Sequence, residues 1–343
     1  MYDDRINEKE LINVLKLVSP GTILRTAIDD ILRAGMGALI VVDAPELRKI
    51  SEGGFKITCK LTSQKIVELA KMDGAIILSS DLSKILYSNI LLVPDVSFST
   101  TETGTRHKAA ERTSKQVGSL VIAISERRKR VTLYYHKIRY ILQNTEELLS
   151  RATETLQILE KQREIFDELL SNLNVLEISN LVVINDVSSM LQRIGIITRT
   201  SRKIERYLTE LGKEGLIIRM RLRELLKGID AQKEFIFKDY NVDNDKQKEF
   251  EELSFDELLD VDNLSKLLFP LPGSEKVTTR GYRILRKTNL QTHAIENLIK
   301  NLDNLDNILN NSEKLEQVLG NYTENFLKDF SSLKEQILMA RKI

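Results

Sequence analysis

The sequence is poor in cysteine, in histidine and in long apolar runs. It contains one cysteine, Cys59, and three histidines among 343 residues. A single cysteine cannot form a disulfide within the chain. No apolar run approaches the about 20 residues that cross a bilayer, and the opening MYDDRINEKE is acidic and polar where a secretory leader would be basic and then apolar. We therefore expect a cytoplasmic protein that does not enter a membrane.

An excess of charge of either sign is also missing. The chain has 51 lysines and arginines against 50 aspartates and glutamates. A balanced chain is not a general nucleic-acid binder, so any site for a polyanion must be local. The length is sufficient for two or three domains, each with a core of its own.

Residues 1–140 alternate between two periodicities. Helical spacing is found in 61–72 and 106–117 and in an amphipathic stretch from Glu8 to Val18. Between them lie short β-rich runs with turn residues near them: GALIVVD (37–43), FKITCKL (55–61), AIILSSD (75–81), NILLV (89–93), SLVIAISE (119–126) and RVTLYY (130–135). This pattern predicts an α/β domain, a mixed central sheet with flanking helices.

Glycine and proline are absent from Ser119 to Ile194, which favours long helices after the last strand. Apolar residues step by three and four from Ile138 through Leu159, so we expect one helix face to begin at Ile138. Helical patterns resume at 187–194 and 199–226. Residues 141–269 are therefore expected to form an all-α linker domain.

The run FPLPGSEK (269–276) concentrates turn-forming residues and marks a second boundary. Short apolar-periodic segments separated by Asn and Asp follow it. We expect residues 270–343 to form a small helical domain.

A basic helix start stands out within ETGTRHKAAER. Gly104 permits a sharp turn, and we expect the Thr105 hydroxyl to cap the helix that follows. Unpaired backbone amides and the helix dipole favour an anion there, and Arg106, His107 and Lys108 add three possible cations in the first turn. The stretch suits phosphate. By spacing alone it is equally well an exposed basic helix start with a Glu111–Lys115 ion pair on the next turns.

A second motif is Asp73-Gly74, at the point where the helical segment 61–72 gives way to an apolar strand. The carboxylate then lies at an end of the sheet, and the glycine allows a ligand to approach the backbone. An ordinary Asp-Gly turn explains the pair in isolation. Combined with the basic helix start, an aspartate that holds a divalent metal and accepts a proton supplies the groups needed for nucleotidyl transfer.

Several motifs, in order and spacing, resemble the diadenylate cyclase domain. With its helical middle and tail, the whole chain resembles the DisA family of DNA integrity scanning proteins. The motifs are SEGGFKI, MDGAIILS, NILLVPD, ETGTRHKAAER and LVIAISERR.

The resemblance implies that two ATP molecules are joined into cyclic di-AMP with release of two pyrophosphates. It implies two cyclase domains that face one another, in a homo-oligomer that is an octamer, with Mg²⁺ or Mn²⁺ as cofactor. Asp73 would activate the ribose 3′-hydroxyl and hold the metal, and Arg106, His107 and Lys108 would be catalytic. The implied ATP-binding residues are Gly74, Ala75, Leu92, Gly104, Thr105, Arg106, His107, Lys108, Ala109 and Ser125.

Two positions depart from the family pattern. Lys108 stands where the family usually has arginine, which keeps the charge but gives up one bidentate contact. Ala109 stands where a threonine is expected, which removes one hydroxyl. We expect these changes to weaken turnover without abolishing it.

The tail resembles paired helix-hairpin-helix units, which bind DNA through hairpin amides that face phosphate. Both hairpins look degraded, because Gly320-Asn321-Tyr322 lacks a second glycine and Thr288-Asn289-Leu290-Gln291 lacks the usual prolines. Residues 289–343 hold eight acids and six bases, which opposes DNA binding. The implied contacts to branched DNA are Lys276, Arg280, Arg283, Arg286, Lys287 and Gly320. The alternative to a DNA-regulated enzyme is a non-catalytic, nucleotide-binding scaffold that binds DNA or a protein partner.

Overall fold

A computed structural model describes residues 2–339, with side chains from residue 10 onward. Arg341 and Lys342, which enter the charge of the tail, lie outside the described residues. Contacts divide the chain into two compact units. The first comprises Met1–Thr153 and Glu205–Arg219, and the second comprises Glu154–Ile204 and Met220–Ile343. The expected boundaries at 140 and 269 stay a prediction.

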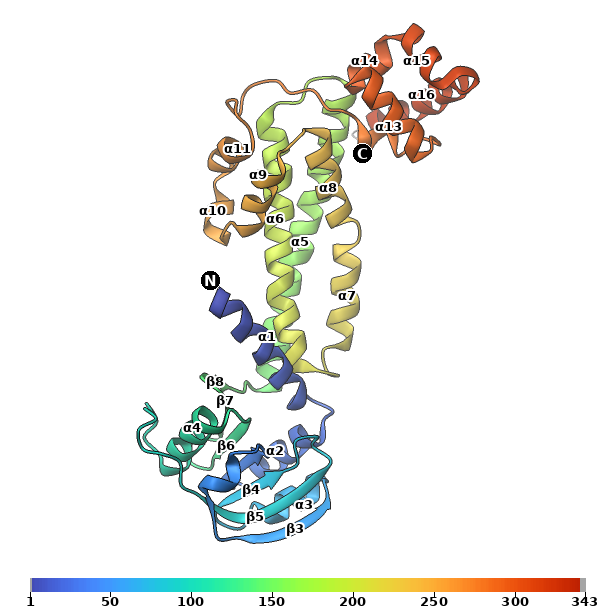
Figure 1. Ribbon diagram of the computed structural model, residues 1–343. Helices are drawn as coiled ribbons and strands as arrows, with labels where there is room; N and C mark the ends of the chain where they lie inside the picture. Colours follow the sequence, from blue (N-terminus) through green and yellow to red (C-terminus); the bar gives the residue numbers. More distant parts are fainter. Residues whose placement is uncertain (1, 340–343) are drawn as a thin grey trace. The chain divides into compact units, whose positions relative to one another are not determined.

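The first unit is an α/β domain, as the sequence predicts (Figure 1). It also contains the start of α5 (Thr145–Ile178), the end of α6 (Ile184–Leu211) and the start of α7 (Leu216–Leu226). Its other elements are α1 (Tyr2–Leu17), α2 (Ile23–Arg33), β1 (Ala38–Val42), η1 (Leu47–Ile50), β2 (Ser51–Glu52), β3 (Phe55–Lys60), α3 (Ser63–Leu69), β4 (Ala75–Leu78), β5 (Lys84–Leu92), α4 (Thr105–Val117), β6 (Val121–Ser125), β7 (Arg130–Tyr135) and β8 (Ile138–Ile141).

The sheet is mixed, with strand order β2-β5-β4-β1-β6-β7-β8 and β3 paired to β5. β1 and β4 run parallel, with Leu39 opposite Ala75. β1 and β6 run antiparallel, with Ala38 opposite Ile124. The starts of β1 and β4 and the end of β6 therefore meet at one end of the sheet.

The sheet is buried on both faces, because successive residues of its central strands enter different cores. Ile40 packs in a cluster with apolar residues of α1, α2 and α3. Its neighbours Leu39 and Val41 pack in a second cluster that includes Ala110 of α4. This explains why the strand sequences are continuous apolar runs rather than alternating ones.

The structure corrects the sequence analysis after β7. Ile138 and Ile141, which were expected on a helix face, form β8, which pairs with β7. A tight turn at His136, where φ is 50°, precedes the strand. The helix begins only at Thr145, where the Asn144 side chain accepts a hydrogen bond from the Glu146 amide at 2.8 Å. Pairing with an existing sheet edge overrides the helical spacing here. The sequence analysis also missed α2.

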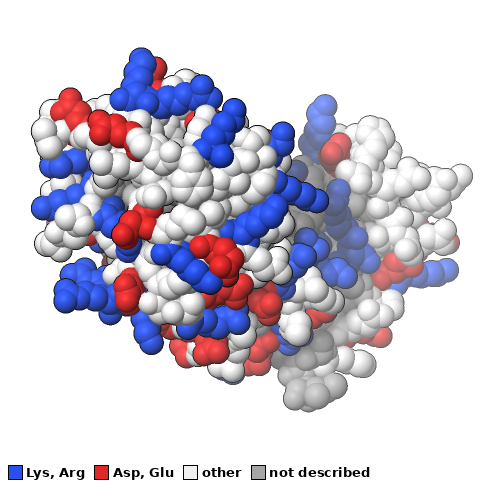
Figure 2. Space-filling view, turned by 90° about the horizontal axis from the view of Figure 1, so that it is seen from below, with Lys and Arg blue, Asp and Glu red and all other residues white. Residues whose placement is uncertain are grey.

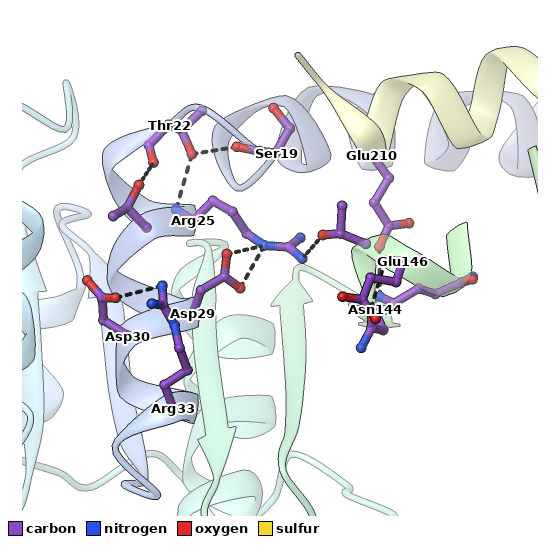
Figure 3. Close-up of polar contacts among 12 residues, drawn as sticks. Ser19, Thr22, Arg25, Asp29, Asp30, Arg33, Asn144, Glu146 and Glu210 are labelled. Atoms are coloured by element: carbon purple, nitrogen blue, oxygen red, sulfur yellow. Dashed lines mark hydrogen bonds and ion pairs between the residues drawn. The ribbon is translucent and has the colours of Figure 1, made fainter. Parts of the chain in front are cut away.

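Within the first unit, buried polar contacts join the sheet domain to the helices (Figure 3). Arg25 of α2 is 5 % exposed, donates from Nε to Asp29 at 3.0 Å, and donates from Nη2 to Thr145 Oγ1 at 2.6 Å. Glu210 of α6 accepts from Tyr140 Oη at 2.5 Å and from the Gln143 amide at 2.7 Å. These contacts explain why residues 205–219 cluster with the sheet domain.

The second unit is helical throughout its regular elements. It contains most of α5, α6 and α7. Its other elements are α8 (Ile229–Asp239), α9 (Asn244–Glu252), α10 (Phe255–Leu259), α11 (Val261–Leu268), α12 (Tyr282–Leu285), α13 (Thr292–Leu302), α14 (Leu305–Asn310), α15 (Ser312–Leu319), η2 (Gly320–Tyr322) and α16 (Thr323–Met339). Between α11 and α12 lies a segment without helix, and it contains the turn-forming run 269–276. One core joins the C-terminal helices to Val175 and Ile178 at the end of α5.

No helix among residues 2–339 is long and apolar enough to span a membrane. Basic and acidic side chains lie side by side on the face shown in Figure 2, with uncharged surface between them. That face therefore offers no large field of one sign.

An ion pair is fully buried in the second unit. The Arg283 guanidinium contacts the Glu177 carboxylate, and their side chains are 1 % and 0 % exposed. Glu177 also accepts from Tyr240 Oη at 2.7 Å. Asp239 accepts from the Tyr282 and Arg283 amides at 2.5 and 3.1 Å. Burial, together with the Glu177 charge, raises the pKa of Asp239 to about 7, against the attraction of Arg283.

Glu177→Gln should destabilise the second unit strongly, because it leaves the buried Arg283 charge without its partner. We expect a loss of about 3–5 kcal/mol in the free energy of unfolding, measured by urea denaturation. Glu160→Gln is the matched control, since Glu160 pairs with Arg221 at 2.8 Å on the surface of the same unit. Equal losses in the two variants would contradict this account.

Candidate functional site

A pocket of ≈ 660 Å³ opens at the end of the sheet where the starts of β1 and β4 meet the end of β6. It gathers segments that are far apart in the sequence. Its lining residues are Leu39, Gly74, Ile90, Leu91, Leu92, Gly104, Thr105, Arg106, His107, Ala109, Ser125, Glu126 and Arg127. One part of the lining is therefore apolar and another is polar, with more positive than negative charge.

Gly74 brings the backbone of the Asp73-Gly74 turn against strand β5. Its φ is 86°, in the left-handed region that favours glycine. A Cβ at this position would lie 2.8 Å from the carbonyl carbon of Asn89. The turn therefore needs glycine for two independent reasons, its conformation and its close approach to β5.

The start of α4 forms the polar side of the pocket. The N-cap is Gly104, with extended φ and ψ of −81° and 141° and no side-chain cap. The expected Thr105 hydroxyl cap is wrong, because Thr105 is already the first helical residue. The Lys108 amide donates to the Gly104 carbonyl at 2.9 Å. The amides before it have no partner within the helix, which leaves them for an anion.

Arg106 lies against Gly37, just before β1, and against the end of β6. Its Nη1 donates to the Ile124 carbonyl at 3.4 Å. A Cβ on Gly37 would lie 2.1 Å from the same nitrogen. The absence of a side chain at residue 37 therefore leaves the space that the guanidinium occupies at the pocket wall.

His107 is half-buried in a group of cations. Desolvation lowers its pKa, the Glu102 carboxylate raises it, and Arg106, Arg128 and Arg139 lower it further; the net direction is down. The neutral imidazole is therefore favoured at pH 7 in the free pocket. A bound phosphate would favour the imidazolium instead, because the charges attract.

The segment before α4 is tied to the body of that helix. The expected Glu111–Lys115 pair is present at 2.7 Å. Glu111 also accepts from Thr100 Oγ1 at 2.6 Å, and Lys115 donates to the Ser99 carbonyl at 2.7 Å. Arg112 Nε donates to the Phe98 carbonyl at 3.0 Å. The pair is thus part of a clamp on the segment, rather than an isolated surface pair.

The structure brings together most of the site residues that the sequence analysis selected. Three lie outside the lining. Ala75 is fully buried in β4, and Asp73 and Lys108 are exposed next to the lining residues Gly74 and His107. The lining residues that were selected are Gly74, Leu92, Gly104, Thr105, Arg106, His107, Ala109 and Ser125.

The sequence analysis missed residues that only the pairing of strands brings to the pocket. Leu39 is the second residue of β1, and Ile90 and Leu91 lie near the end of β5. Glu126 and Arg127 follow Ser125 within the run LVIAISERR. Charged residues directly after an apolar strand are the signal by which the sequence could have indicated these two positions. The sequence around Gly37 does not indicate that this residue lies against Arg106.

The residues fit a divalent metal that is shared with a substrate. No group of three or more metal-ligating side chains occurs among the described residues. Asp73 is one exposed carboxylate at the turn beside the pocket. Mg²⁺ commonly binds through one or two carboxylates and the phosphates of a substrate. One aspartate is therefore adequate where a triphosphate supplies the remaining oxygens.

Comparisons with known proteins cover nearly the whole chain. The family described as DisA bacterial checkpoint controller nucleotide-binding matches residues 25–138. The DisA bacterial checkpoint controller linker region matches residues 142–274.

Curated relatives match nearly the whole chain over nearly their own whole length. The chain is 44 % identical to the DNA integrity scanning protein DisA of Acetivibrio thermocellus, over 92 % of this chain and 91 % of that protein. It is 41 % identical to DisA of Clostridium botulinum, over 97 % and 98 %. It is 40 % identical to DisA of Clostridioides difficile, over 98 % and 99 %.

Gly37→Ala should displace the Arg106 guanidinium and weaken nucleotide binding. The added methyl meets the movable end of a side chain and lies 3.2 Å from the Ile124 carbonyl oxygen, so we expect only a small fall in the melting temperature. Loss of one charge-assisted contact should raise the dissociation constant for ATP by about tenfold, measured by titration calorimetry.

A double-mutant cycle with Arg106→Ala provides the control. If Gly37 acts through Arg106, adding Gly37→Ala to Arg106→Ala should have no further effect on binding. Additive losses would refute this explanation.

Proposed function

The chain belongs to the DisA family and is a diadenylate cyclase, and we propose that its pocket at the sheet end binds one ATP for condensation with a second. The observation that carries the proposal is the meeting of Gly74 with Arg106 and His107 in one pocket. Two ATP molecules give cyclic di-AMP and two pyrophosphates. In each half-reaction a ribose 3′-oxygen forms a bond to the other nucleotide's α-phosphorus, and the bond to pyrophosphate breaks.

The pocket supplies two kinds of surface for such a substrate. Leu39, Ile90 and Leu92 offer buried apolar contacts to the nucleoside. The free amides at the start of α4, with Arg106 and His107, offer donors to the phosphates. These donors stabilise negative charge that develops on the α-phosphate and on the leaving pyrophosphate.

Asp73 is proposed to take the proton of the 3′-hydroxyl and to hold the divalent metal that the family requires. Its position next to Gly74 supports both roles, although its side chain is not part of the pocket wall. The metal is proposed to be Mg²⁺ or Mn²⁺, and it would supply Lewis-acid stabilisation of phosphate oxygens. Ala75 is buried behind the turn, so we assign it support of the backbone and no ligand contact.

A symmetric product needs two equivalent attacks, which one pocket cannot provide. We therefore propose a homo-oligomer in which the pockets of two chains face one another, with the octamer of the resemblance as its form. Exposed apolar residues on the rim support such a contact, with Leu91 60 % exposed. We further propose that the protein works in the cytoplasm, where ATP is available.

The departures from the family pattern fall at the edge of this site. Lys108 is exposed and outside the pocket wall, so it is proposed to act as a point charge on the triphosphate. Ala109 is part of the wall and has no hydroxyl to offer. Reduced turnover, compared with relatives that have arginine and threonine there, is the expected consequence.

We also propose that the C-terminal helices bind branched DNA and regulate the cyclase. Support comes from the exposed Lys276, Arg286 and Lys287 and from Gly320, which has a φ of 54° and open space around it. Arg283 must be withdrawn from this set, because it is buried in the pair with Glu177. Arg280 is partly buried.

Asp73→Asn should abolish cyclic di-AMP formation while ATP binding is retained. Loss of a general base costs about 10²–10⁴ in rate, and loss of a metal ligand adds to this. Product would be measured by chromatography after incubation with ATP and Mn²⁺ or Mg²⁺, with a chelator as a further arm. Asp43→Asn, at the other end of β1, is the matched control. Equal product from Asp73→Asn and the unaltered protein would remove Asp73 from the mechanism.

The double variant Lys276→Gln and Lys287→Gln should weaken binding of branched DNA. Each lost phosphate contact lowers the slope of log affinity against log salt by about one, so we expect a decrease of about two, measured by fluorescence anisotropy. Lys161→Gln with Lys248→Gln changes the same charge at surface ion pairs and should have no effect. DNA binding without any salt dependence would contradict the proposal.

A further inference from the structure

The segment 93–104 carries the chain from β5 to the start of α4, and it has no strand or helix of its own. Its middle part, residues 98–100, is held by the contacts with Glu111, Arg112 and Lys115. The last residues before Gly104 depend on a different contact. That contact lies close to the start of α4, which lines the pocket.

The contact is made by Glu102. Its side chain is 9 % exposed, and its Oε1 accepts from Tyr134 Oη at 2.8 Å and from Arg139 Nε at 2.6 Å. Tyr134 belongs to β7 and is 1 % exposed, and Arg139 belongs to β8. The two donors come from adjacent strands of the sheet. Glu102 thus fastens the segment to a rigid element, two residues before the N-cap of α4.

The carboxylate remains ionised in this position. Burial alone would raise the pKa of Glu102, but the hydrogen bonds from Arg139 and Tyr134 and the charge of Arg139 outweigh it, and the pKa is lowered. Tyr134 stays a phenol, because burial and the adjacent carboxylate raise its pKa. A permanent negative charge therefore stands close to a site proposed for triphosphate.

A negative charge beside an anion site lowers the affinity of that site for the anion unless a positive charge compensates it. Arg139 compensates the charge of Glu102 locally. Glu102 also acts on His107, since its carboxylate raises the pKa of that imidazole, while Arg106, Arg128 and Arg139 lower it. Glu126 and Arg127 line the same pocket as His107.

We propose that Glu102 is a positioning residue of the ATP site, which fastens the start of α4 to β7 and β8 and places one negative charge near His107. This inference rests on the proposed function of the pocket. Glu102 does not line the pocket. It acts through the amides, through Arg106 and through His107.

Two variants test the proposal. Each breaks the Glu102–Arg139 ion pair by changing one of its two members. Glu102→Gln removes the negative charge, and Arg139→Gln removes the positive one. Both should loosen the helix start and weaken its contacts with the phosphates. We expect the KM for ATP to rise by about tenfold, as for the loss of one charge-assisted contact, with a smaller change in kcat. Glu68→Gln, which breaks the exposed pair of Glu68 with Lys71, should leave KM unchanged.

The titration of His107 separates positioning from a merely structural role. Hydrogen exchange at the imidazole C2 position, followed by mass spectrometry, gives the midpoint for each histidine in the full oligomer. Glu102→Gln should move the His107 midpoint to lower pH, and Arg139→Gln should move it to higher pH. The midpoint of His293, in the second unit, should not move.

Failure of this proposal can be distinguished from failure of the proposed function, because the titration of His107 can be measured without enzymatic turnover. Opposite shifts of His107 in the two variants, with raised KM in both, are the expected result. An unchanged KM in both variants, or shifts of His107 in the same direction, would overturn the proposal. If Glu102→Gln does not fold, Arg139→Gln alone decides the question by its KM and by the direction of its His107 shift.

Discussion

The parallel pairing of β1 with β4 is the constraint from which the site follows. In an otherwise antiparallel sheet, it places the starts of both strands at the same end. β6 runs antiparallel to β1, so its end, with Ser125, arrives there as well. Reversal of either direction would send the Asp73-Gly74 turn to the opposite end of the sheet from Arg106. The catalytic roles proposed here therefore depend on strand direction before they depend on any side-chain contact.

The sequence predicted the parts of the site that local chemistry encodes. A glycine between a helix and a strand, and a glycine before a cationic helix start, are recognisable from their immediate neighbours in the sequence, and both turned out to border one pocket. Leu39 and Ile90 could not be recognised, because one apolar residue in a strand resembles another until register is known. The Thr105 cap failed for a related reason. Glycine and threonine are both acceptable caps, and the position of the helix start selected Gly104.

Burial separates charged residues that look equivalent in the sequence. Arg283 belongs to a basic run with Arg280 and Arg286, yet it is the one that points into the core and pairs with Glu177. Glu102 looks like a surface acid of a loop, but Tyr134 lies 32 positions further along the chain and Arg139 lies 37. Such partners are set by tertiary packing, which leaves no periodic signal. The missed strand β8 has the same origin, because β7 was available to pair with it.

Buried polar contacts help to define the joint between the sheet domain and the helices of the first unit. Arg25 contacts Thr145 at the first turn of α5, and Glu210 contacts Tyr140 at the end of the sheet. A buried polar group that loses its partner costs free energy, so each of these contacts favours one arrangement of the two elements that it joins. The joint therefore fixes where α5 begins and α6 ends with respect to β8. Because β8 also supplies Arg139, the residue next to Tyr140, the joint is linked through two adjacent residues of one strand to Glu102, the carboxylate proposed to position the start of α4.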